Sequence, residues 1–339
     1  MANEKIKLTS AEIASIWTGY MNDSLSKCIL GYFLQHVEDK EIRSVVQFAY
    51  DLSSAHIEKL KGIFQQEQIP LPIGFTSEDV NLNAPRLYTD MFMLTYILNM
   101  GKAGLLAYSG FCAMSARKDI RDYFREGLKE TSDLFDKSSE ISLSKGIFVR
   151  APFIAYPSKT DYVDSHKYLS GFSFFSKQRP LNSVEISHLY TNIQTNLMGA
   201  KLATSFAQGS PRKEIQQWML RGRDISEKHI QVFTKALLSN GIQPPVSSDI
   251  SITDSITPPF SDKLTMFHMS LLSATGTGNY ATAAAASQRS DLIINYERLS
   301  LEIAQYAKDG ADIMIKNAWL EQPPGTQDKD KLVKKKEQQ

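Results

Sequence analysis

The chain repeats itself at a fixed spacing, and this duplication constrains its fold more than any other feature. LTSAEI begins at Leu8 and LNSVEI at Leu181, so matching positions lie 185 − 12 = 173 residues apart. A one-residue deletion later reduces the spacing to 172. Identical pairs in this register include Thr18 and Thr191, Phe33 and Phe206, His56 and His229, Tyr108 and Tyr280, and Glu130 and Glu302. Such a register indicates a tandem duplication in which each copy forms a domain.

The length of the chain agrees with two domains. At 339 residues it exceeds the size at which one hydrophobic core usually stops growing. We therefore predict a first domain at residues 1–150, a connecting strap at 151–180, a second domain at 181–325 and a charged tail at 326–339. The tail is expected to be disordered because its composition is almost entirely polar.

Each copy has a helical period of apolar residues throughout, which predicts an all-α fold. Thr9 with Glu12, and Asn182 with Glu185, have the spacing of an N-cap residue and its reciprocal partner. A helix is therefore expected to begin at each repeated word. In the first copy the pattern predicts helices over about 9–38, 40–67, 87–115 and 117–146. Each copy is thus predicted to be a four-helix bundle.

The connection between the second and third helices of a copy is unusually long. In the first copy it reads IPLPIGFTSEDVNLNAPR, from Ile69 to Arg86. Fully extended it could reach about 60 Å, whereas the preceding helix is only about 42 Å long. The connection can therefore run the length of the bundle and leave these two helices parallel. This is the one-crossover arrangement of ferritin-like folds.

The strap at 151–180 is rich in aromatic residues and proline, unlike a flexible linker. We expect its aromatic rings to pack the segment onto the bundles. These rings belong to Phe153, Tyr156, Tyr162, Phe172, Phe174 and Phe175. The alternative is that the strap is a docking surface for a protein partner, because exposed aromatic side chains often mark interfaces.

Composition and charge exclude several kinds of partner. The 38 Lys and Arg residues nearly balance the 37 Asp and Glu residues, so no overall charge favours nucleic acid. The apolar helix expected at 87–115 carries Asn99 and Lys102 near its middle, which argues against a membrane span. No apolar stretch of the secretory kind follows the N-terminus, so we expect the protein to stay in the cytoplasm.

Three polar residues recur in both copies on the inward stripes of the helices. They are His56, Tyr108 and Glu130 in the first copy, and His229, Tyr280 and Glu302 in the second. At 1.5 Å of rise per residue, the predicted helices place all three at about the same height in each bundle. Buried polar groups normally find partners, so we expect them to form a hydrogen-bonded network that fixes the helix register.

A metal site is the competing interpretation of the same residues. Carboxylate-bridged metal proteins of this architecture hold their ions near mid-bundle with Glu residues and Glu-x-x-His pairs. Here the helix expected at 40–67 offers only Ser53-x-x-His56, in which a serine stands where the Glu-x-x-His pair has its glutamate. A degenerate site for iron, manganese or zinc would use His56, Glu130, His229 and Glu302. A small-ligand or acid–base site also remains open, whereas no phosphate loop, zinc spacing or nucleophile elbow is present.

The sequence resembles a family of two-copy, ferritin-like proteins from spore-forming, Bacillus-type bacteria, domain of unknown function 3231, which is distantly related to the spore coat F group. The matching stretches include MGKAGLLAYS, RKDIRDYF, SKGIFVRAPFI, KQRPLNSVEISHLYTNIQTN, TPPFSDKLTMFH and GTGNYATAAAASQRSDL, and they span nearly the whole chain. The resemblance implies a tandem ferritin-like fold and an association with spores. It brings no established activity and assigns no catalytic residue.

These observations leave three functions to separate. The first is a non-catalytic structural or protective role linked to sporulation or stress, and it makes an enzyme the less favoured expectation. The second is a metal-dependent oxidase or metal-storage protein with a degenerate mid-bundle site. The third is a scaffold that binds a protein partner through the strap. Because duplicated domains often reproduce a dimer contact within one chain, we expect an intramolecular pseudo-dimer, and a homo-oligomer remains open.

Overall fold

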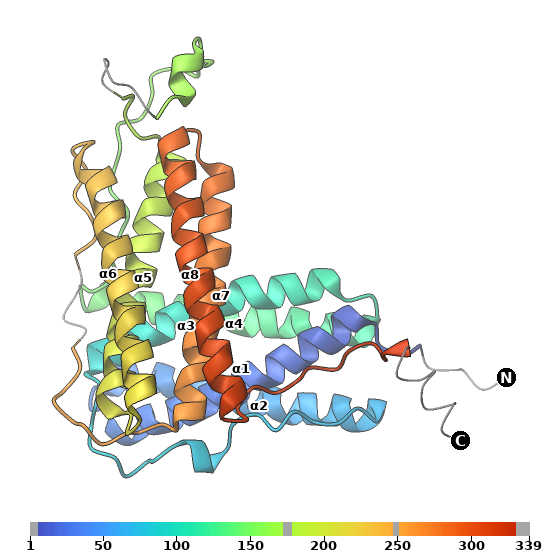
Figure 1. Cartoon of the computed structure of the whole chain (residues 1–339). Helices are drawn as coiled ribbons and strands as arrows, with labels where there is room; N and C mark the ends of the chain where they lie inside the picture. The colour runs from blue at the N-terminus through green and yellow to red at the C-terminus, as the bar shows by residue number, and fades with distance from the viewer. Residues whose placement is uncertain (1–5, 172–177, 247–250, 330–339) are drawn as a thin grey trace.

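The computed structural model describes residues 6–171, 178–246 and 251–329, and within them the chain is all-helical, with eight α-helices and no β-strand (Figure 1). The first half contains α1 (Ser10–His36), α2 (Lys40–Glu67), α3 (Asp90–Met114) and α4 (Lys118–Ser144). The second half contains α5 (Ser183–Gly209), α6 (Lys213–Leu238), α7 (Asp262–Ala286) and α8 (Ser290–Lys316). The short 3₁₀ helices η1 (Ser77–Asp79) and η2 (His166–Leu169) lie in the connections.

Both repeated words begin helices, as predicted. The side chains of Thr9 and Asn182 accept a hydrogen bond from the backbone N–H three residues on, and the glutamate there accepts from the cap in return. The Glu12 carboxylate also accepts from the backbone N–H groups of Ala116 and Arg117, at 2.9 and 2.6 Å. The capping glutamate therefore ties the start of α1 to the α3–α4 turn as well as closing its own helix.

Contacts at the helix ends fix the direction of each helix in the first half. Arg117, at the start of α4, donates to the Glu67 carboxylate at the end of α2. At the opposite end, the Asp90 carboxylate at the start of α3 accepts from the backbone N–H of Asp39, just before α2. Helices α2 and α3 therefore run in the same direction. The connection at 68–89 crosses the bundle from end to end, as its length predicted.

The second half repeats this arrangement. Ser210, before α6, donates to the Asp262 carboxylate at the start of α7, so α6 and α7 also begin at the same end. The backbone conformation after the helices is repeated too: φ is positive at Gln68, which caps α2, and at Gly241, one repeat later and three residues after the end of α6.

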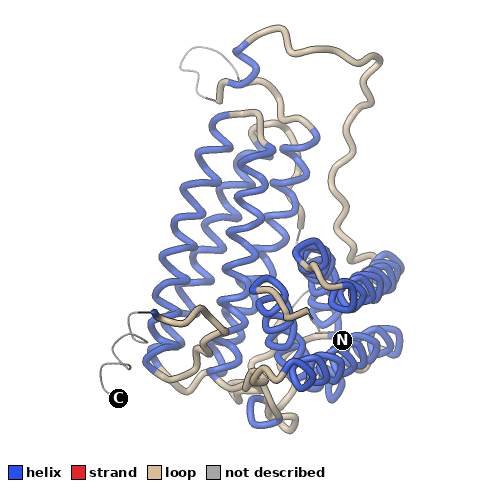
Figure 2. Tube along the Cα trace, turned by 90° about the vertical axis from the view of Figure 1, so that its right-hand side faces the viewer, coloured by secondary structure: helices blue, strands red, loops and turns tan. Residues whose placement is uncertain are grey.

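The two bundles cross each other and meet through their crossover connections (Figures 1 and 2). Val80 forms an isolated antiparallel bridge with Phe260, and Tyr88 forms another with Ile252. Because 80 + 172 = 252 and 88 + 172 = 260, exchanging the two halves turns one bridge into the other. Such self-complementary contacts are the mark of a twofold axis. The halves are therefore related by a pseudo-twofold axis at this point.

One pair of side chains lies on this axis. Tyr96 of α3 and His268 of α7 are one repeat apart, and the Tyr96 hydroxyl is 2.9 Å from His268 Nε2. Both side chains are buried, at 7% and 4% exposure. The surrounding core contains aromatic residues of both halves, including Phe33, Tyr88, Phe92, Phe206 and Phe260. The junction is thus an apolar core shared by the two bundles, with few polar atoms inside it.

The expectation that the rings of the strap pack onto the bundles was wrong for the first three of them, whereas the end of the strap does contact the second bundle, where the Gly171 N–H donates to the Ser290 hydroxyl. Phe153, Tyr156 and Tyr162 are 93%, 94% and 98% exposed and do not pack on the bundles. The end of α4 lies near the junction of the two bundles, whereas α5 begins at the far end of the second bundle. The strap must therefore run along the whole length of the second bundle (Figure 2). It passes helices whose apolar faces are already turned inward against one another. Phe172, Phe174 and Phe175 lie outside the described residues, as does the tail from residue 330.

The expectation that the apolar helix at 87–115 is not a membrane span concerns the surroundings of the chain. None of the helices in the described segments is both long enough and apolar enough to cross a membrane. Cys28 and Cys112 are both free, and burial raises the pKa of the Cys28 thiol to about 12.

Candidate functional site

Each half holds a polar tetrad at mid-bundle, with one residue from each of its four helices. The first tetrad consists of Asp23 (α1), His56 (α2), Tyr108 (α3) and Glu130 (α4). His56 Nε2 is 2.7 Å from Glu130 Oε2, and His56 Nδ1 is 2.8 Å from the Tyr108 hydroxyl. The Tyr108 hydroxyl in turn donates to Asp23 Oδ2 at 3.3 Å. The predicted His–Tyr–Glu trio is thus brought together, and helix α1 adds a fourth member.

The second tetrad has the same geometry with one change of chemistry. It consists of Asn196 (α5), His229 (α6), Tyr280 (α7) and Glu302 (α8). His229 Nδ1 is 2.9 Å from the Tyr280 hydroxyl, and Nε2 is 2.9 Å from Glu302 Oε2. Asn196 Nδ2 donates to the Tyr280 hydroxyl at 2.7 Å. The two histidines are both buried: His56 is 3% exposed and His229 is 0% exposed.

Asp23 and Asn196 are the members that sequence reasoning missed. They occupy the same place in the repeat, because 196 − 23 = 173. Identical residues mark the repeat in the sequence, whereas the residues at this position differ between the copies by one functional group. An ionised carboxylate can only accept hydrogen bonds, whereas the amide nitrogen of asparagine donates them. The two tetrads therefore differ at the side chain that determines the direction of the hydrogen bond between tyrosine and histidine.

The first tetrad holds a charged imidazole. Burial alone would lower the pKa of His56, but hydrogen bonds and charge from Asp23 and Glu130 outweigh burial and raise the pKa to about 9. An imidazolium donates from both ring nitrogens, so Nε2–H points at Glu130 and Nδ1–H at the Tyr108 oxygen. The Tyr108 hydroxyl then donates its own proton to Asp23. Every donor in the first tetrad thus has an acceptor.

The second tetrad holds a neutral imidazole. Burial lowers the pKa of His229, and the hydrogen bond and charge of Glu302 only partly oppose it. Asn196 Nδ2 also donates to the backbone carbonyl of Asn192 at 2.7 Å, which fixes the orientation of the amide. Tyr280 consequently accepts from Asn196 and donates to His229 Nδ1, leaving Nε2–H for Glu302. The tyrosine–histidine hydrogen bond runs in opposite directions in the two halves.

Comparison with known proteins identifies the chain by family. The family model described as "Protein of unknown function (DUF3231)" matches residues 1–160 and again residues 170–332. The chain belongs to this family. The two matches cover the two halves of the structure, so the duplication read from the sequence is the family's unit repeated twice.

Two other comparisons accompany the family match. No curated protein matches this DUF3231 chain. Among solved structures it is similar to a crystal structure described as a "putative spore coat protein" from Bacillus halodurans C-125. That similarity has 17% identity and a TM-score of 0.41, and it covers 45% of this chain and 99% of that chain.

The metal interpretation finds little support in the donor set of this DUF3231 chain. Within residues 6–171, 178–246 and 251–329 no group of three or more His, Cys, Asp or Glu side chains is placed to hold a metal ion. His56 and Glu130 do meet, as do His229 and Glu302, but each pair is joined directly by a hydrogen bond. A metal needs a free lone pair on the imidazole, and both ring nitrogens in each tetrad already face protein partners.

The glutamates connect each buried imidazole to the surface. The Glu130 and Glu302 side chains are 21% and 32% exposed, whereas the imidazoles beside them are buried. The hydrogen bond from His56 holds the pKa of Glu130 below its usual value. Burial would raise the pKa of Glu302, but contacts with Lys228 and His229 bring it below its usual value. Both carboxylates are therefore ionised at neutral pH and act as acceptors.

Proposed function

We propose that this DUF3231 chain is a non-catalytic structural protein made of two ferritin-like four-helix bundles, in which the tetrads hold the helices in register. The observation that carries this proposal is that each tetrad takes one side chain from each of its four helices. A slip of any one helix along the bundle would break a buried hydrogen bond. Leaving a buried polar group without its partner costs about 1–3 kcal/mol.

The ferritin-like assignment rests on topology. Four helices with one long crossover, and with the second and third helices parallel, is the connectivity of ferritin-like bundles. The tetrads lie at mid-bundle, where metal-containing members of that architecture keep their ions. Here the position is occupied by a tyrosine and by an imidazole with both nitrogens engaged. We infer that the bundle is used in this chain for its rigidity.

A pair of tyrosine variants tests the structural role. Tyr108→Phe and Tyr280→Phe each remove one hydroxyl from the middle of a tetrad and leave its ring in place. Both are expected to lower the free energy of unfolding by about 1–3 kcal/mol. Tyr50→Phe removes the hydroxyl of a half-buried tyrosine of α2 that belongs to neither tetrad, so this matched control should change stability little. Wild-type stability in both tetrad variants would refute the proposal.

Elemental analysis of the purified, unchelated chain separates this role from the metal alternative. We expect iron, manganese and zinc to be far below one equivalent per chain. A stoichiometric metal that is lost in His56→Gln and retained in His188→Gln would establish the metal site and overturn the structural proposal. His188 lies at the start of α5, away from both tetrads.

The link to sporulation comes from the resemblance of the sequence to proteins of spore-forming bacteria. It is tested by quantitative mass spectrometry of purified spores and vegetative cells of the native host. Enrichment in spores is the expected result. A protein abundant in growing cells and absent from spores would remove the sporulation role and leave the structural one in place.

A second candidate function, docking of a protein partner on the strap, gains support from the exposure of its aromatic side chains. Phe153, Tyr156 and Tyr162 lie within ten residues of one another and are more than nine-tenths exposed. Such rings are the usual anchors of protein interfaces. A pull-down with the parent and with a triple serine variant tests this candidate, and equal recovery of every partner by both chains would reject it.

A further inference from the structure

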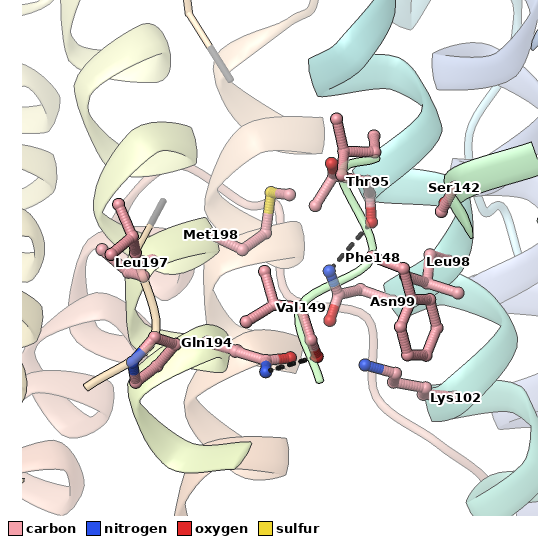
Figure 3. Close-up of a pocket in the computed structure, with 13 residues that line it drawn as sticks. Thr95, Leu98, Asn99, Lys102, Ser142, Phe148, Val149, Gln194, Leu197 and Met198 are labelled. Atoms are coloured by element: carbon pink, nitrogen blue, oxygen red, sulfur yellow. Dashed lines mark hydrogen bonds between the residues drawn. The ribbon is translucent and has the colours of Figure 1, made fainter. Parts of the chain in front are cut away.

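A small pocket lies where the two bundles meet, away from both tetrads (Figure 3). Its volume is about 50 Å³. The walls come from α3, from the end of α4 and the segment after it, from α5 and from the second crossover connection. Apolar side chains, including Leu98, Phe148, Leu197 and Met198, make up most of the lining. The pocket shares no lining residue with either tetrad.

One charged side chain enters this pocket. The amine of Lys102 points inward, toward the side chain of Asn99 (Figure 3). Burial lowers the pKa of the Lys102 amine. Among the described residues, the Lys102 amine has no ion pair and no hydrogen bond. A partly buried ammonium in an apolar cavity is costly unless an anion accompanies it.

The internal repeat shows what occupies the matching place in the other half. Val149, in the pocket wall, corresponds to Glu321, since 149 + 172 = 321. The Glu321 carboxylate accepts from the backbone N–H groups of Ile73 and Gly74, at 2.8 and 2.7 Å, in the first crossover connection. Val246, another wall residue, is the counterpart of Ile73. In one copy a carboxylate thus binds the crossover connection, whereas the other copy has a valine at that position, beside an open pocket.

The chemistry of the two places is complementary. The half that lacks the glutamate has gained a lysine, because the counterpart of Lys102 is Ala274 (102 + 172 = 274). At about 10–15 Å³ per water-sized atom, the pocket has room for about three to five heavy atoms. The carboxylate-bearing end of a glutamate side chain has that size. The pocket therefore matches a carboxylate with a short alkyl chain.

We propose that this pocket binds a free short-chain monocarboxylate of the size of acetate or propionate, with its charge paired to Lys102 and its alkyl end on the apolar wall. Gln194 Nε2 donates to the backbone carbonyl of Val149 at 3.4 Å, and Asn99 Nδ2 donates to that of Thr95 at 2.8 Å. These bonds hold the polar rim in place around the amine. The inference is independent of the role of the tetrads.

The experiment uses the full chain and titrates it with acetate, propionate and hexanoate at constant ionic strength, followed by calorimetry and ligand-observed NMR. Acetate and propionate should bind saturably, and hexanoate at least tenfold more weakly because the pocket cannot enclose it. Lys102→Met should weaken binding of propionate at least tenfold. Lys235→Met, at an exposed lysine of α6, should bind like the parent.

A variant that carries its own carboxylate in the pocket provides a second test. Val149→Glu places in the pocket the side chain that occupies the matching site of the other half, so it should abolish binding of added propionate while the chain stays folded by circular dichroism. If Lys102→Met does not fold, Lys102→Gln replaces it. The proposal fails if the parent shows no saturable binding, if the Lys102 variant binds as tightly as the parent, or if inorganic phosphate competes as well as propionate does.

Discussion

Replacing Asp23 by asparagine should convert the first tetrad into a copy of the second. The substitution keeps the shape of the side chain and removes one negative charge beside His56. The second half already contains the outcome: His229 has a glutamate at the same place, at 2.9 Å, and its pKa is nevertheless lowered. We therefore expect the pKa of His56 to fall from about 9 to below the ordinary histidine value of 6.5 in Asp23→Asn.

The pKa shift sets the size and the sign of the effect on stability. A histidine whose folded pKa is raised stabilises the fold fully below its unfolded pKa, and loses that contribution as the pH rises through its folded pKa. A shift from 6.5 to about 9 for His56 corresponds to about 3 kcal/mol below pH 6.5, and to about 2 kcal/mol at pH 7.5. This contribution should vanish above pH 9. The Asp23→Asn chain should lack it at every pH.

The assay has two parts. NMR of the chain labelled at its six histidines follows the titration of His56 directly. Urea denaturation at pH 6, 7.5 and 9.5 then measures the free energy of unfolding, and the difference between the parent and Asp23→Asn should shrink as the pH rises. A His56 pKa that stays near 9 in Asp23→Asn would refute the reasoning, because Glu130 alone would then hold the charge.

The reciprocal change tests the same cause in the other half. Asn196→Asp should raise the pKa of His229 above 6.5, because it restores a carboxylate to the position of Asp23. Lys228 and Arg298 also lower the pKa of His229, so Lys228→Met is the matched control. If Lys228→Met raised the pKa of His229 and Asn196→Asp did not, the neighbouring cation would be the deciding group.

Three further substitutions test the packing of the first bundle and the contact between the two halves. Gly127→Ala should lower the free energy of unfolding by about 1–3 kcal/mol and disturb the first tetrad, because an added Cβ would collide with the Tyr108 ring. Gly110→Ala, whose Cβ meets nothing within 4 Å, should instead be neutral or slightly stabilising in urea denaturation. Tyr96→Phe should cost about 1–3 kcal/mol by removing the hydrogen bond to buried His268, and wild-type unfolding would contradict that account of the pseudo-twofold contact.

Local sequence signals predicted the helices and their order well. The capping pairs at Thr9 and Asn182 act over three residues, so they can be read without knowing the fold. The length of the connection at 68–89 predicted parallel second and third helices, because chain length limits what a connection can span. The repeat predicted which buried polar residues would meet, since helix rise alone places His56, Tyr108 and Glu130 at one height.

The strap shows what local sequence signals cannot predict, namely whether a connecting segment packs against the helices. Phe153, Tyr156 and Tyr162 are exposed because the two ends of the strap lie at opposite ends of the second bundle, and no residue within the strap encodes that separation. Composition predicted packing, whereas the path of the chain prevented it.

The sequence by itself determined that this chain contains the same helical fold twice, because helix periods, caps and the repeat offset can be read along the chain without knowing the fold. Only the tertiary structure decided that His56 is charged and His229 neutral, and that a pocket with Lys102 remains at the bundle junction. Both depend on side chains brought together from separate helices. Charge energies and cavity volumes are set by distances of a few ångströms between such groups, and those distances exist only once the bundles have packed.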